Sequence, residues 1–165
     1  MADYRLGIDF GGTKIEIAVL DHAGRLLLRE RVPNPGIYDR AVVAVRDFVL
    51  GIETRLDAAP FQNPVAGKAT TSLGIGIPGA ISPETGLVKN ANATWLNNKP
   101  FGRDLDTALQ RSVRVENDAN CFALSEASDG AAAGQSVVFG VIIGTGMGRG
   151  IAMMASLWLA GTPLQ

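Results

Sequence analysis

The beginning of the chain alternates apolar and polar residues with the two-residue period of β-strands. This pattern predicts strands at Tyr4–Phe10, Lys14–Leu20 and Arg25–Val32. Turns rich in glycine separate them, at Gly11-Gly12 and at Asp21–Gly24. Strands joined by such short turns pair as hairpins, so we expect an antiparallel meander at the N-terminus.

The hydrophobic period lengthens after Tyr38. Apolar residues at steps of three and four predict one face of a helix between Tyr38 and Ala59, formed by Val42, Val45, Val49, Ile52 and Leu56. Gly51 lies inside this helix and is expected to weaken it without ending it. The stretch Ala59–Thr71 has no period and is predicted to be a loop.

Strands and helices alternate in the second half of the chain. We predict a strand at Ser72–Ile77, a turn-rich stretch at Ala80–Phe101, helices at Arg103–Arg111 and Asp118–Ala127, and strands at Val113–Glu116 and Val137–Ile143. Together with the opening meander, this order predicts an α/β fold with a mixed sheet and flanking helices.

Composition narrows the class of protein. A chain of 165 residues, 47% hydrophobic, is the size of one domain. Its 15 basic and 16 acidic residues lack the positive excess of nucleic-acid binders. The single cysteine, Cys121, excludes an internal disulfide and a cysteine-rich zinc site. We find no secretory leader and no apolar stretch long enough to span a bilayer, and therefore expect a cytoplasmic protein without membrane partners.

The first turn carries groups suited to a nucleotide's phosphates. Glycines allow backbone N–H groups to approach phosphate oxygens, a hydroxyl and an ammonium group add donors, and a carboxylate can hold Mg²⁺. The candidates are Gly7, Asp9, Gly11, Gly12, Thr13 and Lys14, with Asp9 as the metal ligand. The following alternation of Ile15, Ile17 and Val19 indicates a hairpin rather than a Walker or Rossmann loop. An ordinary tight β-turn is the alternative.

A second glycine cluster follows the strand Val137–Ile143. Its candidates for phosphate binding are Gly144, Thr145, Gly146 and Gly148. Two glycine turns at strand ends would be able to hold one polyphosphate such as ATP from two sides. Taken alone, the cluster is equally well explained as a flexible loop.

Asn117 and Asp118 follow a predicted strand, where α/β sheets commonly place ligand sites. A carboxylate at Asp118 would accept the proton of a sugar hydroxyl that attacks the γ-phosphorus, and Asn117 would hydrogen-bond neighbouring hydroxyls. The commoner use of such residues before a helix is N-capping, and this alternative stays open. The amides and the tryptophan of Lys89–Trp95 suit a polyhydroxylated ring.

The segments Ile8–Lys14, Gly74–Gly79, Asn117–Cys121 and Ile142–Gly146, in this order, resemble four motifs of the ROK family. Within that family, Ile81–Leu96 and Ser125–Gly134 look most like the fructokinase branch.

This resemblance implies an actin-like ATPase, or ribonuclease H-like, lobe. It further implies an enzyme, an ATP-dependent carbohydrate kinase that uses Mg²⁺ to phosphorylate a hexose, with the 6-hydroxyl of fructose as the first choice. Asp118 would be the general base, Asn92, Asn117 and Gly79 would contact the sugar, and the two glycine clusters would hold the phosphates. The partners would be the sugar and ATP, and a homodimer is left open.

Family kinases run to roughly twice this length, a two-domain size. We therefore expect residues 1–151 to form the N-terminal kinase lobe and 152–165 a divergent tail, with the second lobe absent and little activity from this chain alone.

Three alternatives remain. Glucose, mannose or N-acetylglucosamine would replace fructose if the hydrogen-bonding groups differ. A sugar-sensing repressor would carry a helix-turn-helix before the first motif, where only Met1–Asp3 stand. A non-catalytic fragment would bind another polypeptide through an apolar patch, to which residues 153–160 could contribute.

Overall fold

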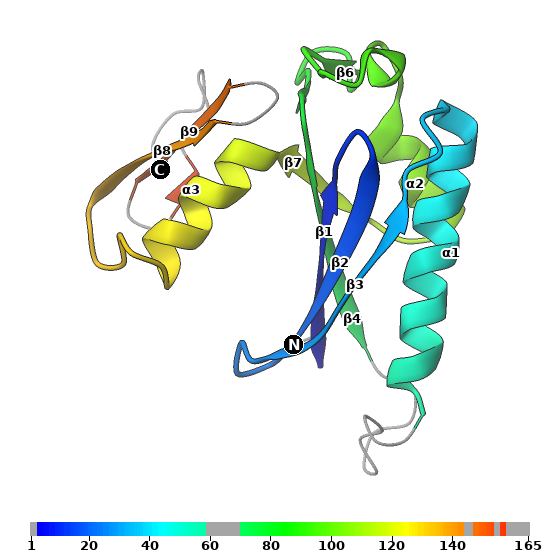
Figure 1. Ribbon diagram of the computed structural model, residues 1–165, viewed down its shortest axis with the longest axis horizontal. Coiled ribbons are helices and arrows are strands. Elements are labelled where there is room, and N and C mark those ends of the chain that lie inside the picture. The colour runs from blue at the N-terminus through cyan, green and yellow to red at the C-terminus, as the bar shows by residue number, and fades with distance from the viewer. Residues whose placement is uncertain (1–2, 59–69, 144–146, 154–155, 158–165) are drawn as a thin grey trace. The chain divides into compact units, whose positions relative to one another are not determined.

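The computed structural model describes residues 3–58, 70–143, 147–153 and 156–157, and in these ranges the chain opens with three strands, continues with helices and strands, and closes with three strands (Figure 1). Two compact units are present, Met1–Val115 and Glu116–Gln165. Most of the predicted loop Ala59–Thr71 lies outside the described residues, as do Gly144, Thr145 and Gly146 of the second glycine cluster.

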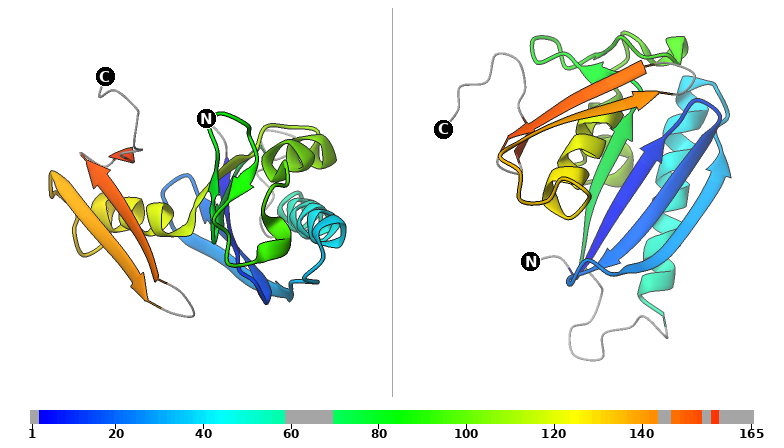
Figure 2. Two further views of the ribbon diagram at one scale, coloured as in Figure 1. Left: turned by 90° about the horizontal axis from the view of Figure 1, so that it is seen from above. Right: turned by 60° about the vertical axis from the view of Figure 1, so that its left-hand side comes forward.

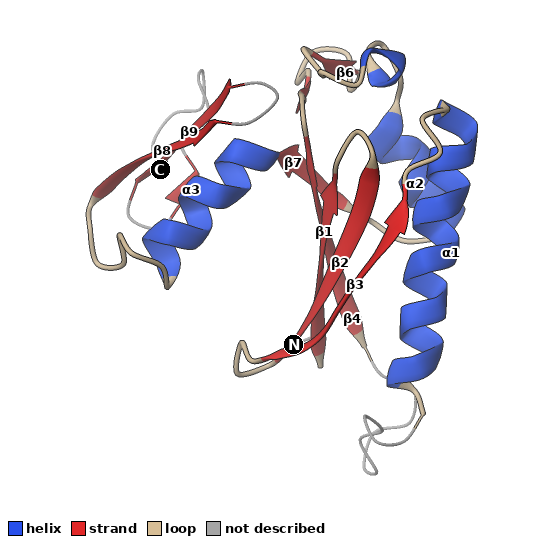
Figure 3. Cartoon of the chain, in the orientation of Figure 1, coloured by secondary structure: helices blue, strands red, loops and turns tan. Residues whose placement is uncertain are grey.

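The first unit is built on a five-stranded mixed sheet, whose last strand contains the boundary between the units. The strand order is β3-β2-β1-β4-β7. The strands are β1 (Tyr4–Phe10), β2 (Lys14–Asp21), β3 (Leu26–Pro33), β4 (Thr71–Ile77) and β7 (Arg114–Asn117). Strands β1, β2 and β3 pair antiparallel, whereas β4 runs parallel to β1. The predicted meander and the mixed α/β sheet are confirmed (Figure 3).

One face of this sheet forms the core of the first unit. In β1 and β2, apolar side chains at every second position point to that face. Helices α1 (Tyr38–Leu56) and α2 (Phe101–Leu109) both lie against it (Figure 2). The buried apolar side chains of β1 and β2 are Tyr4, Leu6, Ile8, Phe10, Ile15, Ile17 and Val19. Burying one such side chain stabilises the fold by about 1.5–3 kcal/mol, so the two-residue alternation decides which face packs.

Helix α1 continues through Gly51, as predicted, but its buried face is shifted by one residue at its start. The buried residues are Tyr38, Ala41, Val45, Val49, Ile52 and Leu56, whereas Val42 is only half-buried. Both series have steps of three or four, so the period alone did not distinguish Ala41 from Val42 as the core position before Val45.

Helix α2 begins and ends two residues earlier than predicted. Phe101, its first residue, is fully buried and anchors the start of the helix, after Pro100. Gln110 has a left-handed backbone (φ 53°), which ends the helix before Arg111. The turn-rich stretch before it contains a two-stranded ribbon, β5 (Ala80–Ile81) and β6 (Val88–Lys89), and a 3₁₀ turn, η1 (Thr94–Leu96).

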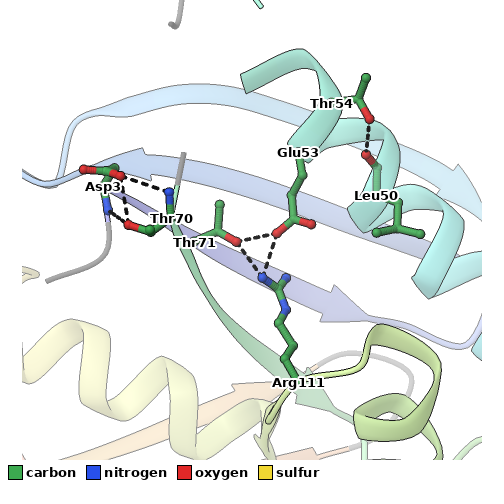
Figure 4. A network of polar contacts seen from close by, with 7 residues as sticks. All are labelled: Asp3, Leu50, Glu53, Thr54, Thr70, Thr71 and Arg111. Carbon is green, nitrogen blue, oxygen red and sulfur yellow. Dashed lines mark hydrogen bonds and ion pairs between the residues drawn. The ribbon is translucent and has the colours of Figure 1, made fainter. Parts of the chain in front are cut away.

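Polar side chains join the helices to the start of β4 (Figure 4). The Arg111 Nη1 donates to Thr71 Oγ1 (2.6 Å) and lies 2.7 Å from Glu53 Oε1, and Thr71 also donates to Glu53. These contacts connect α1, β4 and the segment after α2. The Asp3 carboxylate accepts hydrogen bonds from the backbone N–H and the hydroxyl of Thr70, which holds the starts of β1 and β4 together.

The second unit packs one helix against a small antiparallel sheet. It contains α3 (Asp118–Ser128), β8 (Val137–Ile143), β9 (Met147–Met153) and β10 (Ser156–Leu157), with strand order β10-β9-β8. Its core consists of small side chains: Ala123, Ala127, Val138 and Ala152. Strand β8 was predicted with its observed bounds, whereas β9 was not predicted, because Gly148 and Gly150 suggested a loop.

Helix and sheet approach closely in the second unit because glycines line the strands. A Cβ atom at Gly140 would lie 3.0 Å from the Ala123 Cβ, and one at Gly148 would lie 3.1 Å from the Ala119 Cβ. The opposite face of β8 is apolar and exposed, with Val137, Phe139, Val141 and Ile143, followed by Met147 at the start of β9. Among the helices described here, none combines the length and the apolar character needed to cross a membrane.

Candidate active site

The predicted phosphate turn lies between β1 and β2, as a tight hairpin. Phe10 and Ile15 are paired across the two strands, and the Gly11 N–H donates to the Lys14 carbonyl (3.0 Å), which closes the turn. A Cβ atom at Gly11 would lie 3.0 Å from that carbonyl oxygen, whereas one at Gly12 would meet no atom within 4 Å. A side chain at Gly11 would therefore crowd the carbonyl group that closes the turn, whereas Gly12 faces open space.

Two carbonyl groups of this turn are held by Asn34, which follows β3. The Asn34 side-chain amide donates to the Gly11 carbonyl (2.8 Å), and its backbone N–H donates to the Thr13 carbonyl (2.9 Å). The N–H groups of Gly12 and Thr13 donate to none of the described residues, and both residues are exposed. Two adjacent unpaired N–H groups are the kind of donor that backbone anion sites present to phosphate.

The charged candidates stand along the same hairpin. Asp9 is exposed at the end of β1, opposite Glu16 on β2 and Gly76 on β4. The Lys14 ammonium group is half-exposed and lies 3.8 Å from Glu16 Oε2. Arg29 also binds Glu16, and its hydrogen bond holds the pKa of that carboxyl group below the usual value. Lys14 thus remains accessible to an anion, with its charge partly shared.

Gly7 is placed differently from the other glycines of this motif. It lies in the middle of β1, paired with Ala18 on β2 and with Gly74 on β4, and not in the turn. Its predicted role in phosphate binding would require an approach to the exposed face of the strand.

Aromatic side chains pack around Phe10, the last residue of β1 before the turn. Phe10 is fully buried, and its ring lies 4.9 Å from the Phe101 ring and 6.0 Å from the Trp95 ring. Tyr38 packs edge-on against Phe101 and donates to the Asp104 carboxylate (2.6 Å). Burial, and then the hydrogen bond to Asp104, raise the pKa of Tyr38 above its usual value. These contacts join residues far apart in sequence, which is why periodicity did not reveal them.

Two candidate sugar contacts, Gly79 and Asn92, are brought together in the first unit. The Asn92 N–H donates to the Pro78 carbonyl (3.1 Å). A Cβ atom at Gly79 would lie 2.9 Å from the Ala91 Cβ, so only glycine fits there. Asn92 itself is exposed.

The Asn97 side chain, which no sequence pattern marked as part of a site, binds both backbone groups of Ala91. It accepts from the Ala91 N–H (2.8 Å) and donates to the Ala91 carbonyl (3.1 Å).

Asn117 caps helix α3, so the capping alternative for this residue is confirmed. Its side-chain oxygen accepts hydrogen bonds from the N–H groups of Ala119 (3.1 Å) and Asn120 (3.2 Å). Its amide nitrogen donates to Asp118 Oδ1 (3.2 Å), which also accepts from the Ala119 N–H (2.7 Å). Glu116 supports the cap by accepting from the Asn117 N–H and the Asn120 side chain. The cap fixes Asp118 in the first turn of the helix, where the dipole favours an anion.

The remaining candidates lie in the second unit or outside the described residues. Gly148 is in β9 rather than in a turn, and a Cβ atom there would lie 3.9 Å from Asp118 Oδ1. Gly144, Thr145 and Gly146 are not described. Asp9 belongs to the first unit and Asp118 to the second. Within the described ranges, no three histidine, cysteine, aspartate or glutamate side chains cluster as a metal site would require.

Known proteins similar to this chain include sugar kinases of about twice its length. The chain is 43% identical over 148 residues to an N-acetyl-D-glucosamine kinase from Citrobacter koseri, covering 89% of this chain and 45% of that protein. A similar kinase from Haemophilus influenzae is 41% identical over 147 residues, with the same coverage. A ROK family glucokinase from Streptomyces griseus, solved with glucose and AMPPNP, has a TM-score of 0.77 and 30% identity over 94% of this chain and 46% of that one.

The chain therefore spans about half the length of the curated relatives it matches. The family model for ROK family proteins matches residues 5–161, nearly the whole sequence and ten residues beyond the expected lobe boundary at residue 151. The chain belongs to the ROK family.

Proposed function

We propose that this chain is the phosphate-binding half of an ATP-dependent sugar kinase whose sugar is N-acetylglucosamine, with glucose as the next choice. The observation that carries the proposal is the pair of N–H groups at Gly12 and Thr13, which have no acceptor among the described residues and belong to a turn whose Gly11 and Thr13 carbonyl groups are held by Asn34. The relatives named above support the choice of sugar, because they are N-acetylglucosamine and glucose kinases. They do not support the fructose assignment expected from the sequence.

In the proposed reaction, Asp118 acts on the sugar hydroxyl and the hairpin binds the phosphates. A sugar hydroxyl attacks the γ-phosphorus, a new O–P bond forms, the bond to the bridging oxygen of ADP breaks, and Asp118 takes the hydroxyl proton. Of the oxygens of Asp118, Oδ1 is engaged in the helix cap, so Oδ2 is the atom that would receive the proton. The N–H groups of Gly12 and Thr13, with Lys14, would bind the phosphates of ATP.

The hairpin fits Mg²⁺ in the way kinases use it. Mg²⁺ is commonly bound by one or two carboxylates together with substrate phosphates, rather than by a cage of protein ligands. Asp9 is an exposed carboxylate at the end of β1, next to the turn, and would supply such a ligand. The ion would neutralise charge on the phosphates during transfer.

Gly79 and Asn92 would bind the sugar. Their segments are held together by the Asn92–Pro78 hydrogen bond and by the close approach of Gly79 to Ala91. The Asn117 oxygen is used by the helix cap, so its contact with sugar would go through the amide nitrogen that also donates to Asp118. Such a bond would link the sugar to the base.

The test is a sugar panel on a completed enzyme. Joining this chain to the part of the Citrobacter koseri kinase beyond the matched segment supplies the remaining half, and ADP release is measured with N-acetylglucosamine, glucose, mannose and fructose. We expect N-acetylglucosamine to be phosphorylated with the highest kcat/KM. Preference for fructose would overturn the choice of sugar.

The base is tested in the same enzyme. Asp118→Asn should lower kcat by about 10²–10⁴ while ATP binding is preserved. Asp129→Asn, at the exposed far end of α3, is the matched control and should keep wild-type kcat. Near-normal turnover by Asp118→Asn would remove this residue from the mechanism.

One observation favours a second function, that of a fragment that binds another polypeptide. Phe139 (59% exposed), Ile143 (82%) and Met147 (73%) are exposed apolar side chains on the β8 face. Exposed apolar patches of this kind mark interaction surfaces. The complementary part of a kinase chain is the expected occupant, since the curated relatives are about twice as long. A separately produced second half of the Citrobacter koseri kinase should bind this chain, and Phe139→Asp should abolish binding; unchanged binding would exclude this face.

A further inference from the structure

We propose that Asn34 is a positioning residue for the nucleotide's phosphates, which it serves by holding the carbonyl groups of the Gly11–Lys14 turn. The inference rests on the proposed function of the hairpin. It assigns a role to a residue of the segment between β3 and α1, which contains none of the predicted site residues.

Asn34 engages the turn at two points. Its side-chain Nδ2 donates to the Gly11 carbonyl (2.8 Å), and its backbone N–H donates to the Thr13 carbonyl (2.9 Å). Because each peptide unit points its carbonyl and its N–H in opposite directions, fixing these two carbonyls also fixes the N–H groups of Gly12 and of Lys14. Gly12 follows the Gly11 carbonyl directly, so its N–H is held away from Asn34.

The rest of the turn leaves no competing partner for that N–H group. The Gly11 N–H is used by the Lys14 carbonyl (3.0 Å), whereas the N–H groups of Gly12 and Thr13 have no acceptor among the described residues. Gly12 also faces open space, since a Cβ atom there would meet nothing within 4 Å. An anion can therefore approach this part of the turn without displacing protein.

Asn34 is itself held in place. Pro35 follows it, and a residue before proline is restricted to extended backbone. Its side-chain oxygen accepts from the Gly36 N–H (3.0 Å), and Gly36 has a left-handed backbone (φ 68°), which closes a turn next to the hairpin. Both ends of the amide are thus used, one to stabilise its own turn and the other to hold Gly11.

Two substitutions separate these uses. Asn34→Ala removes both side-chain hydrogen bonds, whereas Asn34→Asp keeps an acceptor for the Gly36 N–H and loses the donor to Gly11. If Asn34 acts only through the turn that its side-chain oxygen forms with Gly36, the Asn34→Asp variant should preserve phosphate binding at high salt, where the added charge is screened. If it positions the phosphate turn, both variants should lose binding.

The experiment is an NMR titration of the 165-residue chain with Mg·ATP and, separately, with inorganic tripolyphosphate. In wild type, the amide signals of Gly12 and Thr13 should shift on titration. Both Asn34 variants should bind about tenfold or more weakly, the effect of one lost charge-assisted hydrogen bond. Gln110→Glu is the matched control: its side chain also donates to a backbone carbonyl, that of Thr107, but at the end of α2. It should bind like wild type.

The outcomes are distinguishable. Wild-type affinity in Asn34→Ala, with a well-dispersed spectrum, would overturn the role of Asn34 and leave the proposed function standing. Absence of any shift at Gly12 and Thr13 in wild type would overturn phosphate binding by the hairpin, and the role of Asn34 with it. Should Asn34→Ala unfold, Asn34→Asp decides alone, with 0.5 M NaCl (a Debye length of about 4 Å) to screen its charge.

Discussion

Gly150 of β9 and Ala119 of α3 are in backbone contact. A Cβ atom at Gly150 would lie 2.8 Å from the Ala119 carbonyl carbon and still closer to its oxygen. Ala119 directly follows Asp118, so the position of the proposed base relative to its own sheet depends on the absence of a side chain at Gly150. The glycine cluster that suggested a loop serves instead to bring a strand against a helix.

The first prediction follows from this contact. Gly150→Ala should force α3 away from β9 and lower the free energy of unfolding by about 1–3 kcal/mol, as overpacked cores do. Gly148→Ala should cost less, because its Cβ atom would meet a methyl group at 3.1 Å rather than backbone. Urea unfolding followed by amide signals of β8 and α3 measures both. Equal stability of the Gly150 variant and wild type would contradict the contact.

The two glycine clusters also show what the sequence reveals and what it does not. Near the N-terminus, strict alternation on both sides of Gly11-Gly12 left only a hairpin, and the structure has one there. Near Gly148 and Gly150, small residues interrupt the pattern because α3 occupies the space that side chains would fill. Because glycines stand where α3 packs against β9, the sequence there lacks the alternating apolar residues from which a strand is predicted.

Long-range partners of the site could not be predicted either. Asn34 lies far from the candidate residue Gly11 in sequence, and the tertiary fold brings the two together. The one local signal was the Pro33–Gly36 stretch, in which an asparagine between two prolines has a restricted backbone. In contrast, the Asn117 cap was predictable because the residue and the helix that it caps are adjacent.

A second prediction concerns Gly79. Gly79→Ala should push the Ala91 segment outward, because the new Cβ atom would lie 2.9 Å from the Ala91 Cβ and 3.0 Å from the Lys89 carbonyl oxygen. The cost should be about 1–3 kcal/mol. Thermal unfolding measures this as a fall in Tm of several degrees. A Tm equal to that of wild type would show that Gly79 and Ala91 are not packed as described.

Gly51→Ala is the matched substitution with the opposite sign. Gly51 is exposed within α1, and a Cβ atom there would meet nothing within 4 Å. Alanine favours the helix over glycine by about 0.5–1 kcal/mol, so Tm should rise. A higher Tm for Gly51→Ala together with a lower Tm for Gly79→Ala would show that the loss at Gly79 comes from local packing and not from replacing a glycine as such.

A third prediction is a pH dependence centred on Asp21. The buried Asp21 carboxylate accepts from the N–H groups of Ala23 and Arg25 and from the Arg25 side chain, and these bonds, Arg25 N–H first, lower its pKa. The unfolded chain therefore takes up a proton at a higher pH than the folded one. The stabilisation is complete at neutral pH and is lost as pH falls below about 4.

Asp21→Asn should accordingly be less stable than wild type at pH 7, with the difference shrinking at pH 2.5. Urea midpoints at the two pH values measure it. Glu84→Gln, an exposed residue in the turn between β5 and β6, is the control. A difference between wild type and Asp21→Asn that is the same at both pH values would mean that the carboxylate charge is not what stabilises this turn.

The last prediction tests the turn itself by filling the space it leaves open. A Cβ atom at Gly12 would meet no protein atom within 4 Å, so Gly12→Val should keep Tm near that of wild type. A branched side chain there would occupy the volume through which a phosphate reaches the Gly12 and Thr13 N–H groups. Nucleotide affinity should therefore fall about tenfold or more, the value of one charge-assisted hydrogen bond. Gly74→Ala, also without a neighbour within 4 Å but in the middle of β4, is the control and should bind Mg·ATP normally. Unchanged affinity in Gly12→Val, measured by the same titration, would mean that the nucleotide's phosphates bind elsewhere.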